Sequence, residues 1–320
     1  MAKILITGGA GFIGSNVCQT LLKDQPFPVE HIAVVDNLSL GKKEFLREFI
    51  DNGQVTLYEQ DLLHFDELLP IFEQHHPALV WHLAANSDIQ YSAIHTDWDL
   101  KQGTLATYNV LECMRRCGAK KLIFSSSSAI YGETKVMPTP EDIGPLFPIS
   151  YYGAAKLAGE GLVSAFCHNA GFQAWMFRFA NIVGRNGTHG VIVDFIKKLR
   201  QDPAALAIFG DGEQAKPYLH VADCVAGMLF GYMRAADQVN YFNLGCPGAT
   251  SVKDITQIVM RQLGLSNVKI SYTGGARGWP GDVPQVRMDT QKMEQLGWRA
   301  SGTSTEAVER ATADLAAQII

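Results

Sequence analysis

A strand, a glycine-rich turn and a helix follow one another at the start of the chain, and this order constrains the fold more than any other feature. The apolar run Ile4–Thr7 leads into Gly-Gly-Ala-Gly-Phe-Ile-Gly, and Ser15–Leu22 has a helical pattern. Gly8, Gly11 and Gly14 recur every three residues. This spacing is typical of a dinucleotide-binding turn, in which glycines allow the tight turn, the approach of a pyrophosphate and the packing of the helix on the strand.

An aspartate ends the next apolar run. Ile32–Val35 is followed by Asp36, 22 residues beyond Gly14. A carboxylate at this place accepts hydrogen bonds from the ribose hydroxyls and repels a 2′-phosphate, so the sequence predicts NAD rather than NADP. The alternative is a strand-end aspartate that only caps a turn in some other α/β protein.

Strand-like runs alternate with helical segments up to about residue 180. The later runs are Val55–Tyr58, Ala78–Leu83, Lys121–Phe124 and Ala174–Phe179. Such alternation predicts an α/β fold with a Rossmann-type, doubly wound parallel sheet, whose ligands bind beyond the carboxyl ends of the strands. We therefore expect one crevice to be lined by the residues that follow these runs, namely Asp61, Ala84, Ala85 and Ser125–Ser128, although Asp61 alone fits an ordinary turn equally well.

The rhythm breaks after about residue 180. Residues 184–190 read as a polar loop, Val191–Leu199 as an amphipathic helix, and residues 274–284 are punctuated by glycine and proline. We expect an NAD-binding domain over residues 1–180 and a smaller C-terminal α/β domain over residues 181–320 that mainly binds substrate, with some of its segments returning to the first domain.

A tyrosine and a lysine four residues apart carry the candidate chemistry. Tyr152 and Lys156 would share one face of a helix, and an ammonium beside a phenol stabilises the phenolate, which makes Tyr152 a candidate general acid or base. The serine run that ends at Ser128 supplies a hydroxyl for the same site. Taken alone, the Tyr–Lys spacing also occurs by chance in many helices.

Composition limits the other possibilities. The net charge of −5 argues against a nucleic-acid partner, and no apolar run approaches the roughly 20 residues that span a bilayer. The first strand begins too close to Met1 to leave room for a signal peptide. The six cysteines have no metal-like spacing, so we expect no metal and a reduced, cytoplasmic location.

The chain resembles the extended short-chain dehydrogenase/reductase family, and within it the NAD-dependent nucleotide-sugar epimerases of the UDP-glucose (UDP-galactose) 4-epimerase type. The resemblance runs almost from end to end, through segments 7–14, 36–38, 61–62, 82–85, 124–132, 152–156, 178–181, 206–210, 218–223 and 281–284. It implies that Ser127, Tyr152 and Lys156 are catalytic. The cofactor-binding residues that it implies are Gly8, Gly11, Phe12, Ile13, Gly14, Asp36, Asn37, Asp61, Leu62, Leu83, Ala84, Ala85, Gln102, Ser125, Tyr152 and Lys156. The substrate-binding residues that it implies are Ser127, Ser128, Asn181, Val191, Ala207, Ile208, Phe209, Lys216, Tyr218, Arg277 and Asp282.

Several positions depart from the family pattern. Lys216 stands where an arginine is usual, so the bidentate grip on a phosphate is lost. An asparagine that contacts NAD in many relatives is absent, and its contact either passes to Gln102 or is lost. Val286 stands where a bulky tyrosine excludes N-acetyl groups from the galactose enzymes. Arg185 is either a solvated loop residue or a partner for a sugar carboxylate.

The resemblance implies epimerisation of a UDP-sugar at C4 through a transient 4-keto intermediate, in a homodimer formed by the helices at Thr107–Cys117 and Tyr152–Phe166. Glucose/galactose, an N-acetyl sugar or a uronic acid are the candidate sugars. A 4,6-dehydratase would carry Asp-Glu where this chain has Ser128-Ala129, and a decarboxylase would carry a glutamate nearby. A plain NAD-dependent sugar dehydrogenase or reductase and a non-catalytic NAD-binding protein are the remaining alternatives.

Overall fold

The computed structural model describes residues 1–86, 89–275 and 286–319, which form two compact units. The first unit comprises residues 1–132, 145–178 and 228–242, and the second comprises residues 133–144, 179–227 and 243–320. The chain therefore passes between the units at five points, whereas a single boundary at residue 180 with some returning segments was expected.

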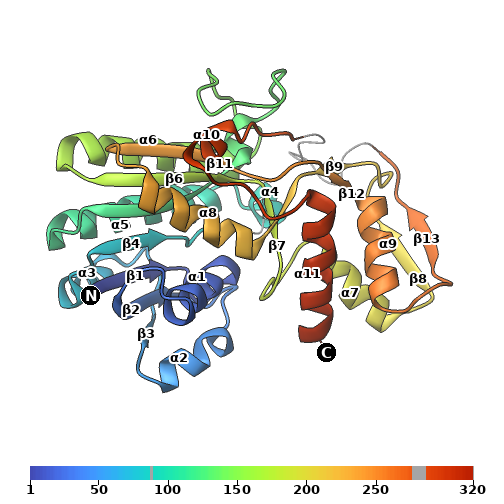
Figure 1. Ribbon diagram of the computed structural model, residues 1–320, viewed down its shortest axis with the longest axis horizontal. Coiled ribbons are helices and arrows are strands. Elements are labelled where there is room, and N and C mark those ends of the chain that lie inside the picture. Colours follow the sequence, from blue (N-terminus) through green and yellow to red (C-terminus); the bar gives the residue numbers. More distant parts are fainter. Residues whose placement is uncertain (87–88, 276–285, 320) are drawn as a thin grey trace. The chain divides into compact units, whose positions relative to one another are not determined.

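A seven-stranded sheet forms the centre of the first unit (Figure 1). Its strands lie in the order β11-β6-β5-β4-β1-β2-β3, and the pairs from β5 to β3 are parallel. The strands are β1 (Ala2–Thr7), β2 (Val29–Asp36), β3 (Val55–Glu59), β4 (Leu79–His82), β5 (Lys121–Ser127), β6 (Gln173–Phe179) and β11 (Val239–Leu244). The strand order reverses between β1 and β4, and the carboxyl ends at such a switch point form the usual ligand site of this fold. The expected Rossmann-type α/β fold is confirmed.

Helices cover both faces of this sheet. Ile4–Thr7 of β1 are all buried, as expected for a strand that is covered on both sides. The helices α3, α5 and α6 pack beside one another on one face, while Gly231 of α8 lies against the ring of Phe177 in β6. The helical segments of this unit are α1 (Phe12–Lys23), η1 (Lys43–Leu46), α2 (Arg47–Asp51), α3 (Phe65–His75), α4 (Ile89–Ile94), the π-helix η2 (Leu100–Leu105), α5 (Ala106–Cys117), η3 (Ser128–Tyr131), α6 (Tyr151–Ala170) and the second half of α8 (Val221–Arg234).

The second unit has its own apolar core. The helices α7, α9 and α11 pack against one another, and two-stranded sheets pair β10 with β7, β12 with β9 and β13 with β8. Its elements are β7 (Asn181–Val183), α7 (Val191–Gln201), β8 (Ala205–Ile208), β9 (Ala215–Lys216), β10 (Tyr218–His220), β12 (Thr250–Ser251), α9 (Val252–Gln262), β13 (Lys269–Tyr272), α10 (Gln291–Leu296) and α11 (Ser304–Gln318). Side-chain capping boxes at Ser251 and Thr303 start α9 and α11.

Two local expectations need correction. The serines Ser125, Ser126 and Ser127 lie inside β5 and do not follow it, because the strand continues to Ser127. Residues 133–144 belong to the second unit because Thr139 exchanges backbone hydrogen bonds with Arg287 and Asp289, far along the chain.

Candidate active site

The turn after β1 is shaped so that only glycine fits at its key positions. Gly8 has a φ of +71°, and a Cβ there would lie 2.7 Å from the backbone nitrogen of Ala84. A Cβ on Gly14 would lie 2.2 Å from the carbonyl oxygen of Gly8. The helix α1 begins at Phe12 with no side-chain cap, so its first amides are available to an anion. This cradle fits the pyrophosphate of a dinucleotide, as the sequence predicts.

Asp36 ends β2 beside this turn and is almost fully buried. Its Oδ2 accepts a hydrogen bond from the backbone N–H of Ala10 at 3.0 Å, and its Oδ1 accepts one from Leu38 at 2.9 Å. Burial raises the pKa of Asp36, and these amides partly offset the rise. The carboxylate thus does cap a turn, as in the alternative considered for it, and its selection of NAD stays a prediction.

Asp61 gathers two other predicted cofactor residues. Its Oδ2 accepts hydrogen bonds from the amides of Asn37 at 3.0 Å and Gln102 at 3.3 Å, while Oδ1 accepts one from Leu63 N–H at 2.9 Å. Partial burial raises the pKa of Asp61, but these hydrogen bonds outweigh it and the net shift is downward. The structure therefore places Asn37, Asp61 and Gln102 in one group.

A directed chain of hydrogen bonds joins the ends of β1 and β4 to the π-helix. The Thr107 hydroxyl donates to Gly103 O at 2.5 Å, so its oxygen accepts from His82 Nε2–H at 2.9 Å. His82 Nδ1 is then unprotonated and accepts from the Thr7 hydroxyl at 2.7 Å, whose oxygen accepts from Ala84 N–H at 3.4 Å. Burial, and to a smaller degree Lys156, lower the pKa of His82 to about 3, so the imidazole is neutral. These hydrogen bonds fix the tautomer of His82, and no local sequence pattern indicated them.

The structure brings Ser127, Tyr152 and Lys156 together. Ser127 lies close enough to Tyr152 to lower the pKa of its phenol, and the Ser127 Oγ accepts from Ala129 N–H at 3.2 Å. Lys156 is buried, its Nζ donates to Ser125 O at 2.6 Å, and it lies 5.9 Å from the centre of the Tyr152 ring.

Local backbone features hold α6 against the serine segment. The hydroxyl of Ser150 caps α6 by accepting from Gly153 N–H at 3.0 Å. A Cβ on Gly153 would lie 2.6 Å from the carbonyl oxygen of Ala129, so only glycine allows this approach. The start of the helix, which carries Tyr152, is therefore fixed beside Ser127.

The titration of the pair is strongly perturbed. Burial raises the pKa of Tyr152 to about 12, with a smaller rise from Asp99 and an opposing effect of the Ser127 hydrogen bond. Burial lowers the pKa of Lys156 to about 8, against the opposing effects of Asp99 and Glu160. The pKa of Lys156 thus moves towards neutral pH, whereas the pKa of Tyr152 moves away from it, contrary to the lowering that was expected from a neighbouring ammonium.

Tyr152 and Lys156 are surrounded by further charged and polar groups, which the sequence analysis did not single out. Glu160 and Arg178 form a buried two-pronged ion pair, with N···O distances of 2.9 and 2.8 Å, and Arg178 also donates to the Tyr131 hydroxyl at 2.9 Å. Asp99, which precedes Gln102 by three residues in the sequence, is also buried. Local sequence pattern could not identify the Glu160–Arg178 pair or Asp99, because the residues that they contact lie far away in the chain.

The other predicted cofactor residues lie around the same strand ends. Leu62 is buried, Leu83, Ala84 and Ala85 are half-buried, and Phe12 and Ile13 open α1. Ser128 begins the short helix η3 next to Ser127.

The predicted substrate residues of the second unit lie on several elements. Asn181 is on β7, where its N–H donates to Pro217 O at 3.2 Å, and Val191 begins α7. On β8, Ala207 is exposed and Ile208 is buried, and the adjoining Phe209 is 63% exposed with Lys198 Nζ 5.2 Å from its ring centre. Arg277 and Asp282 lie outside the described residues, whereas Arg185 is exposed and Val286 is half-buried.

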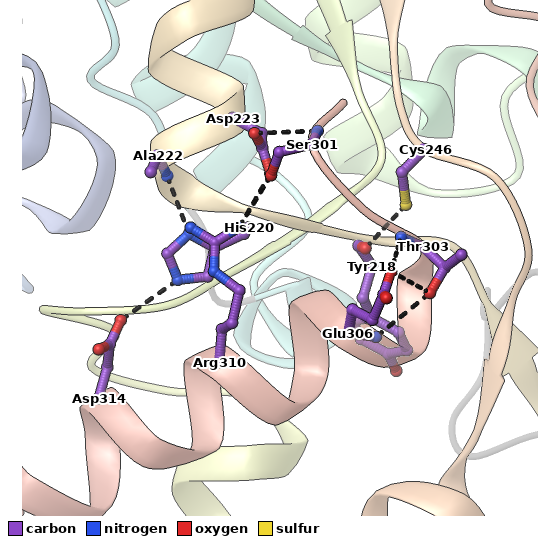
Figure 2. Close-up of polar contacts among 10 residues, drawn as sticks. All are labelled: Tyr218, His220, Ala222, Asp223, Cys246, Ser301, Thr303, Glu306, Arg310 and Asp314. Carbon is purple, nitrogen blue, oxygen red and sulfur yellow. Dashed lines mark hydrogen bonds and ion pairs between the residues drawn. The ribbon is translucent and has the colours of Figure 1, made fainter. Parts of the chain in front are cut away.

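Lys216 and Tyr218 lie on β9 and β10. The Tyr218 ring packs in the core of the second unit, and its carbonyl oxygen accepts from the Cys246 thiol at 3.0 Å (Figure 2). Two residues on, His220 Nδ1 accepts from Ala222 N–H at 3.2 Å and Nε2 contacts Asp314 Oδ2 at 3.2 Å. These contacts fix the corner between β10 and α8, and a substrate contact of Tyr218 stays a prediction.

Within the described ranges, no three His, Cys, Asp or Glu side chains are grouped as metal ligands, and no helix has the length and apolar character that a membrane crossing requires. A short-chain dehydrogenase/reductase is defined by two features together: the glycine cradle at the switch point, and the group of Ser127, Tyr152 and Lys156, in which the lysine follows the tyrosine by four residues. More closely, the chain belongs to the NAD dependent epimerase/dehydratase family, which its residues 4–245 match. The prediction of NAD as cofactor is thereby confirmed.

Several known proteins are similar over nearly the whole chain. A crystal structure of UDP-galactose 4-epimerase is 36% identical, with 99% of this chain and 100% of that chain covered and a TM-score of 0.87. UDP-glucose 4-epimerase from Thermotoga maritima, solved with UDP-glucose, is 32% identical, with 99% and 100% covered and a TM-score of 0.87. UDP-arabinose 4-epimerase 1 from Arabidopsis thaliana is 30% identical over 97% of this chain and 78% of its own length.

Proposed function

We propose that the protein is an NAD-dependent epimerase that inverts C4 of a UDP-hexose through a transient 4-keto sugar. The observation that carries the proposal is the grouping of Ser127, Tyr152 and Lys156 in the unit that also holds the glycine cradle. The names of the similar proteins support C4 of a UDP-sugar as the reacting centre.

In the proposed reaction, Tyr152 moves the proton of the sugar hydroxyl. Its phenolate oxygen accepts that proton during oxidation and returns it during reduction. Ser127, which lies beside Tyr152, donates to the same sugar oxygen and orients it. The Lys156 ammonium stabilises the phenolate, because opposite charges close together favour each other's ionised form. NAD supplies the hydride acceptor and donor for C4.

The two units have different roles in this proposal. The first unit binds NAD through the glycine turn, Asp36 and the group around Asp61. The second unit binds the nucleotide and the diphosphate through Asn181, Phe209 and Lys216, and through Arg277 and Asp282 outside the described residues. The exposed Phe209 ring offers a face on which a base can stack, which supports this assignment.

The substrate test uses purified protein with no added NAD. UDP-glucose, UDP-N-acetylglucosamine and UDP-glucuronate are incubated separately, and the anomeric proton signals are followed by NMR. A C4 epimer from any of them supports the proposal and identifies the sugar. A 4-keto-6-deoxy product or released CO₂ would instead indicate a dehydratase or a decarboxylase. A need for added NAD with net accumulation of NADH would indicate a plain dehydrogenase.

A homodimer in the cytoplasm completes the proposal. Exposed apolar side chains lie on and beside the neighbouring helices α5 and α6, with Leu105, Tyr108 and Tyr151 about half exposed. Such side chains on adjacent helices suit a four-helix contact with a second copy. All six cysteines are free, as expected in a reducing compartment. Light scattering at micromolar concentration should give twice the 35.1 kDa chain mass, and the monomer mass alone would contradict the dimer.

A further inference from the structure

Asp99 is a buried carboxylate that the proposed reaction does not use. It is 1% exposed, and its Oδ1 accepts a hydrogen bond from Asn86 Nδ2 at 3.0 Å. The same Asn86 amide donates to Ser92 Oγ at 2.7 Å, which anchors it from the other side. Within residues 1–86, 89–275 and 286–319, Asp99 Oδ2 has no hydrogen-bond partner. An acidic oxygen that is buried without a partner is costly, so it invites a functional explanation.

The path of the backbone brings Asp99 towards α6, the helix that carries Tyr152 and Lys156. Asp99 directly precedes the π-helix η2, and η2 packs against α6. The two helices approach closely at Gly103, where an added Cβ would lie 2.8 Å from the Cβ of Ala155. Gly103 lies about one π-helical turn beyond Asp99, while Ala155 lies beside Lys156 and about one turn beyond Tyr152. Wide π-helical turns of this kind are frequent at functional sites.

Asp99 differs from the other charged groups near Tyr152 and Lys156 in its effect on their pKa values. Asp99 raises the pKa of both Tyr152 and Lys156, whereas Glu160 acts on Lys156 alone and is already paired with Arg178. His82 is neutral because burial depresses its pKa. Among the carboxylates of the described residues, Asp99 is therefore the one that acts on both Tyr152 and Lys156.

We propose that Asp99 is a positioning residue that supplies the counter-charge of the Tyr152–Lys156 pair. Its carboxylate, held by Asn86, keeps Lys156 an ammonium and sets the pH range in which Tyr152 can exchange a proton. The proposal rests on Tyr152 being the acid/base of the proposed function. It assigns control of the pH range of the reaction to a residue that transfers no proton itself.

The first test is the pH–rate profile of Asp99→Asn, which removes the charge and keeps an oxygen to accept from Asn86. Loss of a nearby negative charge favours the phenolate and disfavours the ammonium, so both limbs of the profile should move to lower pH, by about one unit. Ser92→Ala is the matched control, because it disturbs the anchor of Asn86 without changing any charge, and its limbs should stay in place. Asp99→Glu keeps the negative charge, so both limbs of its pH–rate profile should lie where they do in the wild type.

A second measurement does not depend on turnover. The absorbance of the Tyr152 phenolate is titrated in NAD-loaded protein as the difference between each protein and its Tyr152→Phe counterpart. The midpoint should fall by about one pH unit when Asp99 becomes asparagine. Asp99→Ser, which is also neutral and is smaller, replaces the asparagine variant if that variant does not fold.

The outcomes separate the two proposals. If no UDP-sugar is converted but the phenolate midpoint falls, the proposed function is wrong and the role of Asp99 as counter-charge stands. If the neutral variants leave the midpoint and both limbs unmoved, the role of Asp99 is wrong. An equal displacement in Ser92→Ala would also overturn it, because packing would then explain the effect.

Discussion

Acidification from pH 7.5 to pH 5 should destabilise the fold through the buried imidazole of His82. Both ring nitrogens are committed in the neutral form, Nε2 as donor to Thr107 and Nδ1 as acceptor from Thr7. A second proton on Nδ1 would face the Thr7 hydroxyl and remove this acceptor. The unfolded chain has no such restriction, and its histidine takes up a proton near the reference pKa of about 6.5.

The size of the effect follows from the two pKa values. The pKa of His82 is lowered from 6.5 to about 3 in the folded protein, so the unfolded state binds more protons between these pH values. Stability is therefore fully present above pH 6.5 and is lost as the pH falls below it. At about 1.4 kcal/mol per pH unit, the loss from this residue is about 2 kcal/mol at pH 5 and approaches about 5 kcal/mol near pH 3.

Urea unfolding at pH 7.5, 6 and 5 measures this loss. His82→Gln is the comparison, because glutamine keeps a donor and an acceptor but cannot take up a proton in this range. Burial also lowers the pKa of His75 and His220, but these residues are common to both proteins and cancel in the difference. Wild type should lose about 2 kcal/mol more than the variant between pH 7.5 and pH 5. Equal losses in the two proteins would refute the assignment of a buried neutral His82.

Three further changes test the site. Tyr152→Phe should reduce kcat by about 10²–10⁴-fold while NAD stays bound, because it removes proton transfer and little packing; a rate within about tenfold of wild type would exclude Tyr152 as the acid/base. Asp36→Asn should narrow the preference for NAD over NADP in titrations of apo protein, whereas an unchanged ratio would leave Asp36 as a turn cap only. Gly153→Ala places a Cβ 2.6 Å from Ala129 O, so it should displace α6 and lower kcat by about tenfold or more, and unaltered kinetics would show that Tyr152 tolerates this shift.

Local sequence pattern predicted the first unit well where the fold depends on neighbouring residues. The turn at Gly8–Gly14 and the runs that became β1 to β6 were found because a short apolar run, a glycine turn and a helix form one contiguous unit. The serines Ser125–Ser127 were placed beyond their strand, because serine favours turns and its burial beneath a lysine cannot be read locally.

Long-range contacts account for what the sequence did not predict. The counter-charge at Asp99 depends on packing of η2 against α6, and the tautomer of His82 depends on threonines from two other elements. In the second unit, residues around Thr139 are tied to residues near 288 by backbone pairing that leaves no trace in either segment alone. Such features are set by tertiary structure, which overrides local propensity.

Because the chain passes repeatedly between its two units, this passage determines which truncated fragments of the protein can fold. A gene fragment that stops at residue 180 would encode the glycine turn, Tyr152 and Lys156, yet it would lack residues 228–242, which include most of the edge strand β11. The backbone of β6 would lose its neighbour, and the ring of Phe177 would lose its cover from α8. An exposed strand edge of this kind is prone to pair with other chains, so such a fragment should aggregate. A soluble dinucleotide-binding module would instead require residues 228–242 to be grafted back through a designed linker.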